Sequence, residues 1–198
     1  MSDLQPGCPG RVADSLRRVS PAAATDLLRP ALLEGLALLL AAAEPPSRFG
    51  EAVIARAAEL LAAVDRVVVD PTGDEVEPRD ADVVVWDGAS LAGPRDVLDG
   101  AWLALRPLAK VWIDGEQPGG KLLLIAPPPY DAGAEAARAG LENLARTLSI
   151  EWARYGIRTA ALLPGGATDP AAVAELAAFL ASRAGDYYSG CHFRLGDA

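Results

Sequence analysis

Residues 134–164 constrain the fold more than any other stretch, because a long amphipathic pattern is followed there by a short apolar run. The apolar side chains recur every three or four residues, the period of one face of an α-helix. They are Ala137, Leu141, Leu144, Leu148 and Trp152. Gly156 is placed to end this helix, and residues 157–163, followed by Pro-Gly, have the composition of a buried strand. The segment therefore predicts a long helix that leads into a strand.

Strand-like and helix-like patterns alternate along the rest of the chain as well. The expected strands are residues 36–43, 66–69, 82–86 and 121–126, and the expected helices are residues 49–64 and 97–111. Pro107 should break or kink the second of these helices. Asp169 or Thr168, followed by Pro170 in the first helical position, predicts one more helix. The alternation favours a shortened Rossmann-like three-layer α/β/α fold with a mostly parallel sheet of about six strands.

Length and hydropathy favour one domain without a membrane span. Residues 31–198 are enough for a single core, and residues 1–30 are interpreted as an N-terminal arm whose short helical pattern is broken by proline. No uncharged apolar run approaches the roughly 20 residues of a membrane span. The first ten residues lack the basic and apolar regions of a secretory signal. We therefore expect a cytoplasmic protein that does not bind membranes.

Charge and cysteine usage exclude further classes of function. The formal net charge is -9, and most of it comes from residues 65–99, which hold ten carboxylates and three arginines. Nucleic acid requires a basic surface, so no nucleic-acid partner is expected. Cys8 and Cys191 lie far apart in the sequence, and His192 is the only histidine. This composition excludes a disulfide framework and argues against a metal site.

The C-terminal third resembles a known family. Residues 137–170 read ARAGLENLARTLSIEWARYGIRTAALLPGGATDP, and residues 174–197 read AELAAFLASRAGDYYSGCHFRLGD. They are similar to the short-chain dehydrogenases/reductases, in which a helix opening with Tyr-x-x-x-Lys leads to a strand and a Pro-Gly turn. A helix ending in Phe-Leu-Ala-Ser and a last strand entered through Thr-Gly or Ser-Gly then follow. The resemblance fades toward the N-terminus.

The resemblance implies a catalytic Asn, Ser, Tyr and Lys, and this chain has other residues at all four positions. In the family the tyrosine donates the proton, the lysine lowers its pKa and holds the ribose, and the serine orients the carbonyl. The corresponding residues here are Ala101 for Asn, Pro127 for Ser, Ala134 for Tyr and Arg138 for Lys. Alanine donates nothing, and an arginine with a pKa above about 12 does not replace a tuned lysine. Tyr130 is considered as a displaced acid, although it precedes Arg138 by eight residues rather than four.

The cofactor turn implied by the resemblance is also altered. The family has Thr-Gly-x-x-x-Gly-x-Gly, whose glycines let the backbone reach a pyrophosphate at a helix N-terminus. Here the loop is AAAEPPSRFG, with Ala41 at the first glycine position and Gly50 near the helix start. Proline removes amide donors, and Glu44 repels phosphate. Ser47 and Arg48 are suited to hold an anion, or alternatively to serve as a helix cap and a solvated side chain.

Three further segments match the family in part. Asp70 could bind the cofactor ribose or simply form the Asp-Pro-Thr-Gly turn. Trp86 and Asp87 replace two asparagines that lie against the cofactor in the family, and Trp86 is interpreted either as filling the cofactor space or as a core aromatic. The family's substrate lid of about 20 residues is missing after the Pro-Gly turn. The weak cofactor-binding candidates are Ser47, Arg48, Gly50, Asp70, Gly88, Pro164, Gly165 and Thr168. We expect no cofactor, with residual NAD(H) binding left open.

The favoured hypothesis is a catalytically inactive family member that serves as a structural or regulatory subunit, similar to the inactive partner or inactive half of 3-ketoacyl reductases. Two alternatives remain: an active NAD(P)-dependent oxidoreductase with a rebuilt site, and a binding module for a nucleotide or acyl thioester. In the family the Tyr-x-x-x-Lys helix and the helix before it pair with another subunit. We therefore expect a homo-oligomer or a hetero-oligomer with an active reductase. The predicted interface residues are Ala136, Gly140, Thr147, Trp102 and Leu105.

Overall fold

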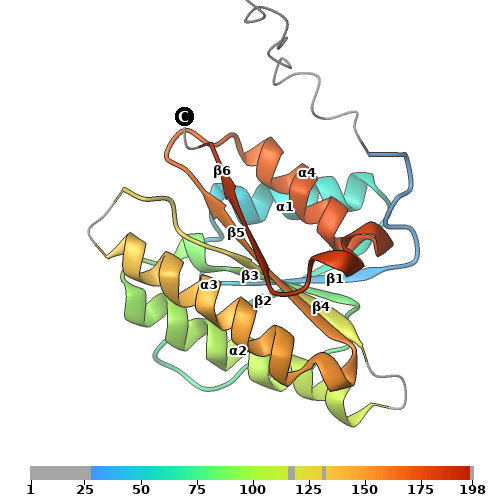
Figure 1. Cartoon of the computed structure of the whole chain (residues 1–198), viewed down its shortest axis with the longest axis horizontal. Coiled ribbons are helices and arrows are strands. Elements are labelled where there is room, and N and C mark those ends of the chain that lie inside the picture. The colour runs from blue at the N-terminus through green and yellow to red at the C-terminus, as the bar shows by residue number, and fades with distance from the viewer. Residues whose placement is uncertain (1–27, 116–118, 131–132, 197–198) are drawn as a thin grey trace, which may run out of the picture.

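A single parallel sheet forms the middle layer of the molecule (Figure 1). The computed structural model describes residues 28–115, 119–130 and 133–196. The strands are β1 (Ala37–Ala42), β2 (Ala63–Val68), β3 (Val83–Asp87), β4 (Gly120–Ile125), β5 (Ile157–Pro164) and β6 (Cys191–Leu195). Their order is β2-β1-β3-β4-β5-β6, and all five pairings are parallel. The predicted Rossmann-like α/β fold is confirmed.

Two pairs of helices cover the two faces of the sheet (Figure 1). One face packs against α2 (Pro94–Asp114) and α3 (Ala134–Glu151), and the other packs against α1 (Arg48–Glu59) and α4 (Pro170–Ala181). Three short 3₁₀ helices complete the order: η2 (Gly88–Ser90), η3 (Ala153–Tyr155) and η4 (Arg183–Tyr188). The expected helix and strand at residues 134–164 are present as α3 and β5, and Gly156 adopts a left-handed φ of 70° between them.

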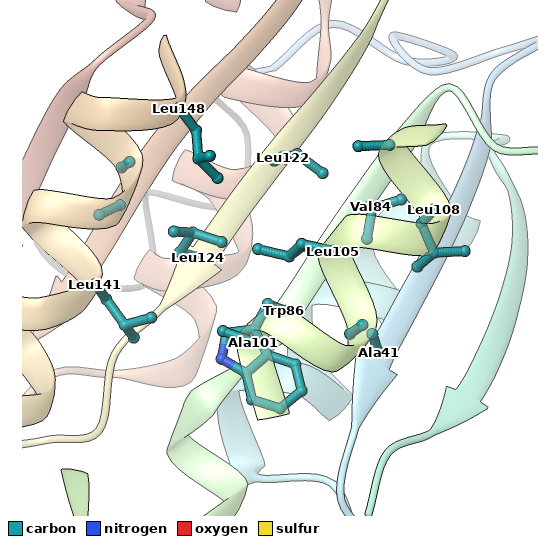
Figure 2. Close-up of a cluster of buried hydrophobic side chains, with 14 of the residues drawn as sticks. Ala41, Val84, Trp86, Ala101, Leu105, Leu108, Leu122, Leu124, Leu141 and Leu148 are labelled. Atoms are coloured by element: carbon teal, nitrogen blue, oxygen red, sulfur yellow. The ribbon is translucent and has the colours of Figure 1, made fainter. Parts of the chain in front are cut away.

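The alternation of side chains along β3 assigns Trp86 and Asp87 to opposite faces of the sheet. Val84 and Trp86 belong to the core under α2 and α3, whereas Val83 and Val85 belong to the core under α1 and α4. Figure 2 shows the Trp86 ring beside Ala101 of α2. Trp86 is fully buried, so its interpretation as a core aromatic is confirmed. Asp87 faces the opposite side, toward α1.

The end of α1 differs from the prediction. The helix was expected to continue to residue 64, but it ends at Glu59, and Val64 lies in β2. Leu61 adopts a φ of 68°, and the bonds Leu61 N–H to Ala58 O and Ala62 N–H to Ala57 O form a Schellman motif. Glycine is the usual residue at this position, so leucine gave no indication of the helix end.

Of the break or kink predicted at Pro107, the break is corrected, because α2 continues through this residue. Proline has no N–H, so the carbonyl of Leu103, four residues earlier, loses its helical donor. The Val76 N–H donates to this carbonyl at 3.3 Å instead. Residues 69–82, which connect β2 to β3 without a helix, are thereby held against α2.

Two of the predicted interface residues have their main contacts inside the subunit. Leu105 is fully buried in the core under α2 and α3, which corrects its assignment to an interface. A Cβ atom at Gly140 would lie 2.7 Å from the end of the Leu98 side chain of α2, so this glycine packs against its own chain, and its predicted place at an interface stays a prediction. Trp102 remains 44% exposed. Ala136 and Thr147 are exposed as well.

The N-terminal arm lies almost entirely outside the described residues, as does Cys8. Leu28 and Leu32 pack against the core under α1 and α4, and Leu33 is buried there. The Leu33 N–H donates to Leu60 O at 3.0 Å, which joins this segment to the end of α1. Within the described ranges, none of the helices combines the length and apolar character needed to cross a membrane.

Candidate functional site

The order of the strands identifies where a ligand would be expected. The chain passes from β1 to β2 on one side and then returns to place β3 on the other side of β1. In open α/β sheets, ligands bind outside the carboxyl ends of the strands at such a switch point. We call the side of the sheet where the strands end the carboxyl edge. At the switch point it contains the start of α1, which follows β1, and Asp87, the last residue of β3.

Asp87 is hydrogen-bonded directly to the start of α1. The Ser47 N–H donates to Asp87 Oδ2 at 2.7 Å, and the Ser47 hydroxyl donates to Asp87 Oδ1 at 2.7 Å. Ser47 Oγ in turn accepts the N–H groups of Phe49 and Gly50, both at 3.2 Å. A Cβ atom at Gly50 would overlap the carboxylate. The side chain of Asp87 therefore fills the space immediately before α1.

Burial and hydrogen bonding act in opposite directions on the pKa of Asp87. Burial is the largest effect and raises the pKa, because it disfavours the charged form. The bonds from Ser47 and the backbone amide of Ala89 lower it, and the nearby charge of Glu51 raises it again. The net effect is a raised pKa. As pH rises through that pKa, ionisation of the buried acid lowers the stability of the fold.

The three cofactor candidates at α1 therefore have different roles. Ser47 is the N-cap of α1, as the structural interpretation predicted, and it also binds Asp87. Gly50 provides room for the carboxylate. Arg48 is exposed, as its alternative interpretation predicted, and its guanidinium lies 4.7 Å from the centre of the Phe49 ring. The Asp87 carboxylate thus lies at the start of α1, the end of the helix at which Rossmann-like folds hold a pyrophosphate.

Arg138, at the position of the family's lysine, joins the ends of two strands. Its Nη1 donates to the carbonyl of Pro127 at 2.9 Å and to that of Pro164 at 2.6 Å. Its Nε lies 3.4 Å from Glu135 Oε1, and the side chain is 3% exposed. Arg138 therefore connects the segment after β4 to the end of β5.

The other positions implied by the resemblance carry groups without acid–base chemistry. Ala101 is fully buried against the core, and Ala134 is 6% exposed at the start of α3. Pro127 offers a carbonyl, which Arg138 uses. None of these three side chains has a polar atom.

The Pro-Gly turn after β5 is held by bonds to β6. The Gly165 N–H donates to Leu195 O at 2.6 Å and to Thr168 Oγ1 at 2.7 Å, and the Thr168 hydroxyl donates to Leu195 O at 2.6 Å. Pro164 contributes its carbonyl to Arg138. Gly88 lies so close to β4 that a Cβ atom there would be 2.9 Å from the carbonyl oxygen of Ile125. Each of these four cofactor candidates therefore has a structural contact within the chain.

Tyr130 and Arg48 meet at the carboxyl edge although they are 82 residues apart. The Tyr130 hydroxyl donates to the carbonyl of Gly166. Arg48 Nη2 lies 3.4 Å from the Tyr130 oxygen and 3.5 Å from the carbonyl oxygen of Thr168. Tyr130 is 63% exposed. Its hydroxyl therefore lies at the carboxyl edge near the start of α1.

Asp70 forms the turn after β2. Its Oδ1 accepts the N–H of Thr72 at 2.9 Å and the hydroxyl of Thr72 at 2.8 Å. The backbone bond from Thr72 is the largest cause of its lowered pKa, followed by the hydroxyl bond. The interpretation of Asp70 as a turn former is confirmed. The alternative role in ribose binding stays a prediction.

Other parts of the described chain show a hollow but no metal site. No group of three His, Cys, Asp or Glu side chains in these ranges is arranged to hold a metal ion. A hollow of about 510 Å³ opens at the opposite edge of the sheet, where β1, β3, β4 and β5 begin, and Lys121 and Arg158 are among its lining residues. Lys121 lies 2.7 Å from Asp186 and donates to the carbonyls of Leu180 and Ser182, so it ties the end of α4 to β4.

Asp87 is the functional-site residue that sequence reasoning missed. The sequence analysis identified Asp87 as a replacement for an asparagine but predicted no role for its carboxylate. The sequence places an acidic residue directly after four apolar ones, at the end of a strand buried on both faces. A carboxylate at such a place requires donors, and its partner Ser47 is 40 residues earlier.

Comparisons with known proteins agree with the fold. No protein-family model matches the chain. A Bacillus subtilis protein named "probable 2,4-dienoyl-CoA reductase" is 43% identical over 75 residues, which are 35% of this chain and 30% of that protein. The match therefore spans less than a third of the relative.

Solved structures share the architecture at low identity. A citronellol catabolism dehydrogenase of Pseudomonas aeruginosa matches with a TM-score of 0.65 and 19% identity, covering 85% of this chain and 96% of its own. A gluconate 5-dehydrogenase of Burkholderia cenocepacia, solved with NADP and tartrate, matches with a TM-score of 0.65 and 18% identity, covering 82% and 94%. These similarities show the fold of the chain.

Replacing Arg138 by methionine tests its structural role. We expect the free energy of unfolding to fall by roughly 3 kcal/mol, because two buried carbonyls lose a charged donor. Arg146→Met is the matched control on the same helix, where the arginine is exposed and paired with Glu142, and it should cost less than about 1 kcal/mol. Urea unfolding of the three proteins gives the comparison. Equal losses in the two variants would contradict the role assigned to Arg138.

Proposed function

We propose that this chain is a non-catalytic member of the short-chain dehydrogenase/reductase family that acts as a structural or regulatory subunit. Family membership is supported by the sequence motifs of residues 137–170, by the relative that is 43% identical over 75 residues, and by the shared fold. The activities of those proteins are oxidoreductase activities by name. The absence of catalysis is inferred from the site.

The observation that carries the proposal is the pair of hydrogen bonds that Arg138 donates to the carbonyls of Pro127 and Pro164. At this point the family needs a lysine beside a tyrosine, so that the pKa of the acid is lowered and the ribose is held. Here the cation is buried and engaged by the backbone, and Ala134 stands where the acid would be. A group that holds two strand ends together is not available to a substrate.

The alternative of an active oxidoreductase with a rebuilt site is favoured by one feature. Tyr130 presents its hydroxyl at the carboxyl edge beside the Arg48 guanidinium, at 3.4 Å. A tyrosine hydroxyl that is open to solvent and within reach of a cation is a candidate proton donor for a bound carbonyl. A cofactor would then have to enter away from Asp87, because the space at the start of α1 is filled.

The proposed subunit role requires a surface for a partner, and we propose the outer face of α2 and α3. Ala136 and Thr147 of α3 are exposed small residues, and Trp102 of α2 is 44% exposed. Small residues allow another helix to approach closely, and an exposed tryptophan is typical of an interface. The partner is a second copy of this chain or an active reductase.

Calorimetry with NAD(H) and NADP(H) tests the proposed function. We expect no measurable heat of binding at sub-millimolar cofactor and no oxidation of NADPH in the presence of a β-ketoacyl substrate. A micromolar isotherm together with turnover that is lost in Tyr130→Phe would establish the alternative. Heat on titration with an acyl-CoA alone would instead indicate a binding module.

Light scattering tests the partner surface. We expect a dimer or larger assembly whose interface buries well over ~1,200 Å² in total, and Trp102→Glu should shift it toward the monomer. Tyr187→Glu is the matched control, since Tyr187 is 90% exposed on η4. A monodisperse wild-type monomer at micromolar concentration would refute the homomeric form. Co-purification with an active reductase would then test the heteromeric form.

A further inference from the structure

The strand β2 lies at one end of the sheet, and among the residues that the structure describes no strand pairs with its outer side. Its inner side pairs with β1 in parallel. Residues 69–82 then lead to β3 without adding a strand to the sheet. An open edge of this kind presents backbone N–H and C=O groups that a strand of another molecule can use.

The bonds between β1 and β2 show which backbone groups of β2 point outward. The Ala63 N–H donates to Leu36 O at 2.9 Å. The Val69 N–H donates to Ala42 O at 2.8 Å. Because successive residues of a strand direct their backbone groups to opposite sides, the odd-numbered residues face β1 and the even-numbered residues face outward. Arg66 is the middle one of the outward-facing residues.

Two side chains of the same chain bond both outward-facing groups of Arg66. Asp65 Oδ1 accepts the Arg66 N–H at 2.8 Å. Arg79 Nη1 donates to the Arg66 carbonyl at 3.5 Å. The same Arg79 nitrogen lies 2.9 Å from Asp65 Oδ2, so the two side chains also form an ion pair with each other. We call Asp65 and Arg79 the edge pair.

The charges of the edge pair also oppose the approach of another strand. The bond from the Arg66 N–H is the largest cause of the lowered pKa of Asp65, followed by the bond from Arg79. The Asp65 side chain is 69% exposed and that of Arg79 is 42% exposed. A strand placed beside Arg66 would have to remove water from both charged groups, which is unfavourable unless they find new partners.

The rest of β2 is suited to pairing with another strand. Val64, Val67 and Val68 are β-branched residues, which favour strands. Val68 is one of the outward-facing residues, and it is 61% exposed. Without the edge pair, β2 would therefore combine an apolar edge residue with a free donor and a free acceptor at Arg66, which is the pattern of an association site.

The partner that fits this edge is β2 of a second copy. In an antiparallel pair of strands, two residues that lie opposite each other can exchange both of their N–H to C=O bonds. A two-fold axis at Arg66 would place this residue opposite its own copy, and such self-complementary contacts are characteristic of two-fold dimers. The N–H and carbonyl needed for this exchange are the two groups that the edge pair bonds.

We propose that Asp65 and Arg79 prevent β2 from pairing with β2 of a second copy. The edge pair thereby determines which surface of the subunit is open to other chains. In this respect the inference rests on the proposed function, because it leaves the outer face of α2 and α3 as the surface for a partner.

The test removes the edge pair in the variant Asp65→Ala/Arg79→Ala. Trp102→Glu is included in every protein compared, so that the face of α2 and α3 contributes as little as possible. We expect the edge variant to dimerise at least about tenfold more tightly than Trp102→Glu alone, because two further backbone hydrogen bonds form between the copies. Sedimentation velocity at a series of micromolar concentrations measures this change.

Two further variants show whether the new contact is made by β2. Asp74→Ala/Arg183→Ala removes the same two residue types from exposed positions, and it should leave sedimentation unchanged. Adding Arg66→Pro to the edge variant removes the outward N–H and leaves the bonds to β1 intact, as proline does on edge strands. We expect this addition to reverse the dimerisation.

The result that would overturn the inference is a folded edge variant that sediments like Trp102→Glu alone. Dimerisation that Arg66→Pro does not reduce would overturn it as well. Asp65→Thr/Arg79→Gln replaces the alanine variant if that variant does not fold. Failure of the proposed partner surface gives a different result, namely assembly of the protein with an intact edge pair that Trp102→Glu does not weaken.

Discussion

The hydrogen bonds between Asp87 and Ser47 join β3 to the start of α1 at the point where the sheet changes direction. The rest of the carboxyl edge depends on this contact. It satisfies the hydrogen-bonding groups of the buried carboxylate and of the N-cap of α1 without a ligand. A dinucleotide would have to displace a group that is already bonded at 2.7 Å on both oxygens. At this point the carboxyl edge therefore has its hydrogen bonds made within the chain.

Polar side chains are also bonded within the chain further along the carboxyl edge, at the ends of β4 and β5. Arg138 supplies donors to the carbonyls of Pro127 and Pro164, and Thr168 ties the following turn to Leu195. In an enzyme, such groups would be left for a substrate and would cost stability when empty. Here each of these groups is bonded within the chain and contributes to the stability of the free protein.

The fold was predictable from the sequence wherever the signal is local. The spacing of Leu141, Leu144 and Leu148 defines α3, and Gly156 marks its end because its left-handed φ suits glycine. The end of α1 was missed because Leu61 adopts that conformation without being glycine. The continuity of α2 through Pro107 was missed because the compensating donor, Val76, lies in a distant loop.

The sequence was enough to predict that the residues expected for the family are replaced in the candidate site. It did not predict the hydrogen bonds that the replacing residues form. Aligning the motifs needs only residue identity, and it was the basis for the prediction that Ala134 and Arg138 take the positions of the family's tyrosine and lysine. The bonds of Arg138 to two strand ends, and of Asp87 to a serine 40 residues away, depend on strand order and register. Gly140 shows that a small residue has more than one explanation, since it was predicted to face another subunit and it also packs against Leu98 of the same chain.

A crystal structure of the wild-type protein grown with millimolar NADP(H) tests the central claim most directly. The account predicts Asp87 within hydrogen-bond distance of both polar groups of Ser47, Arg138 bonded to the carbonyls of Pro127 and Pro164, and no cofactor density at the start of α1. A cofactor phosphate bound to the α1 amides, with the Asp87 carboxylate turned away from Ser47, would contradict it.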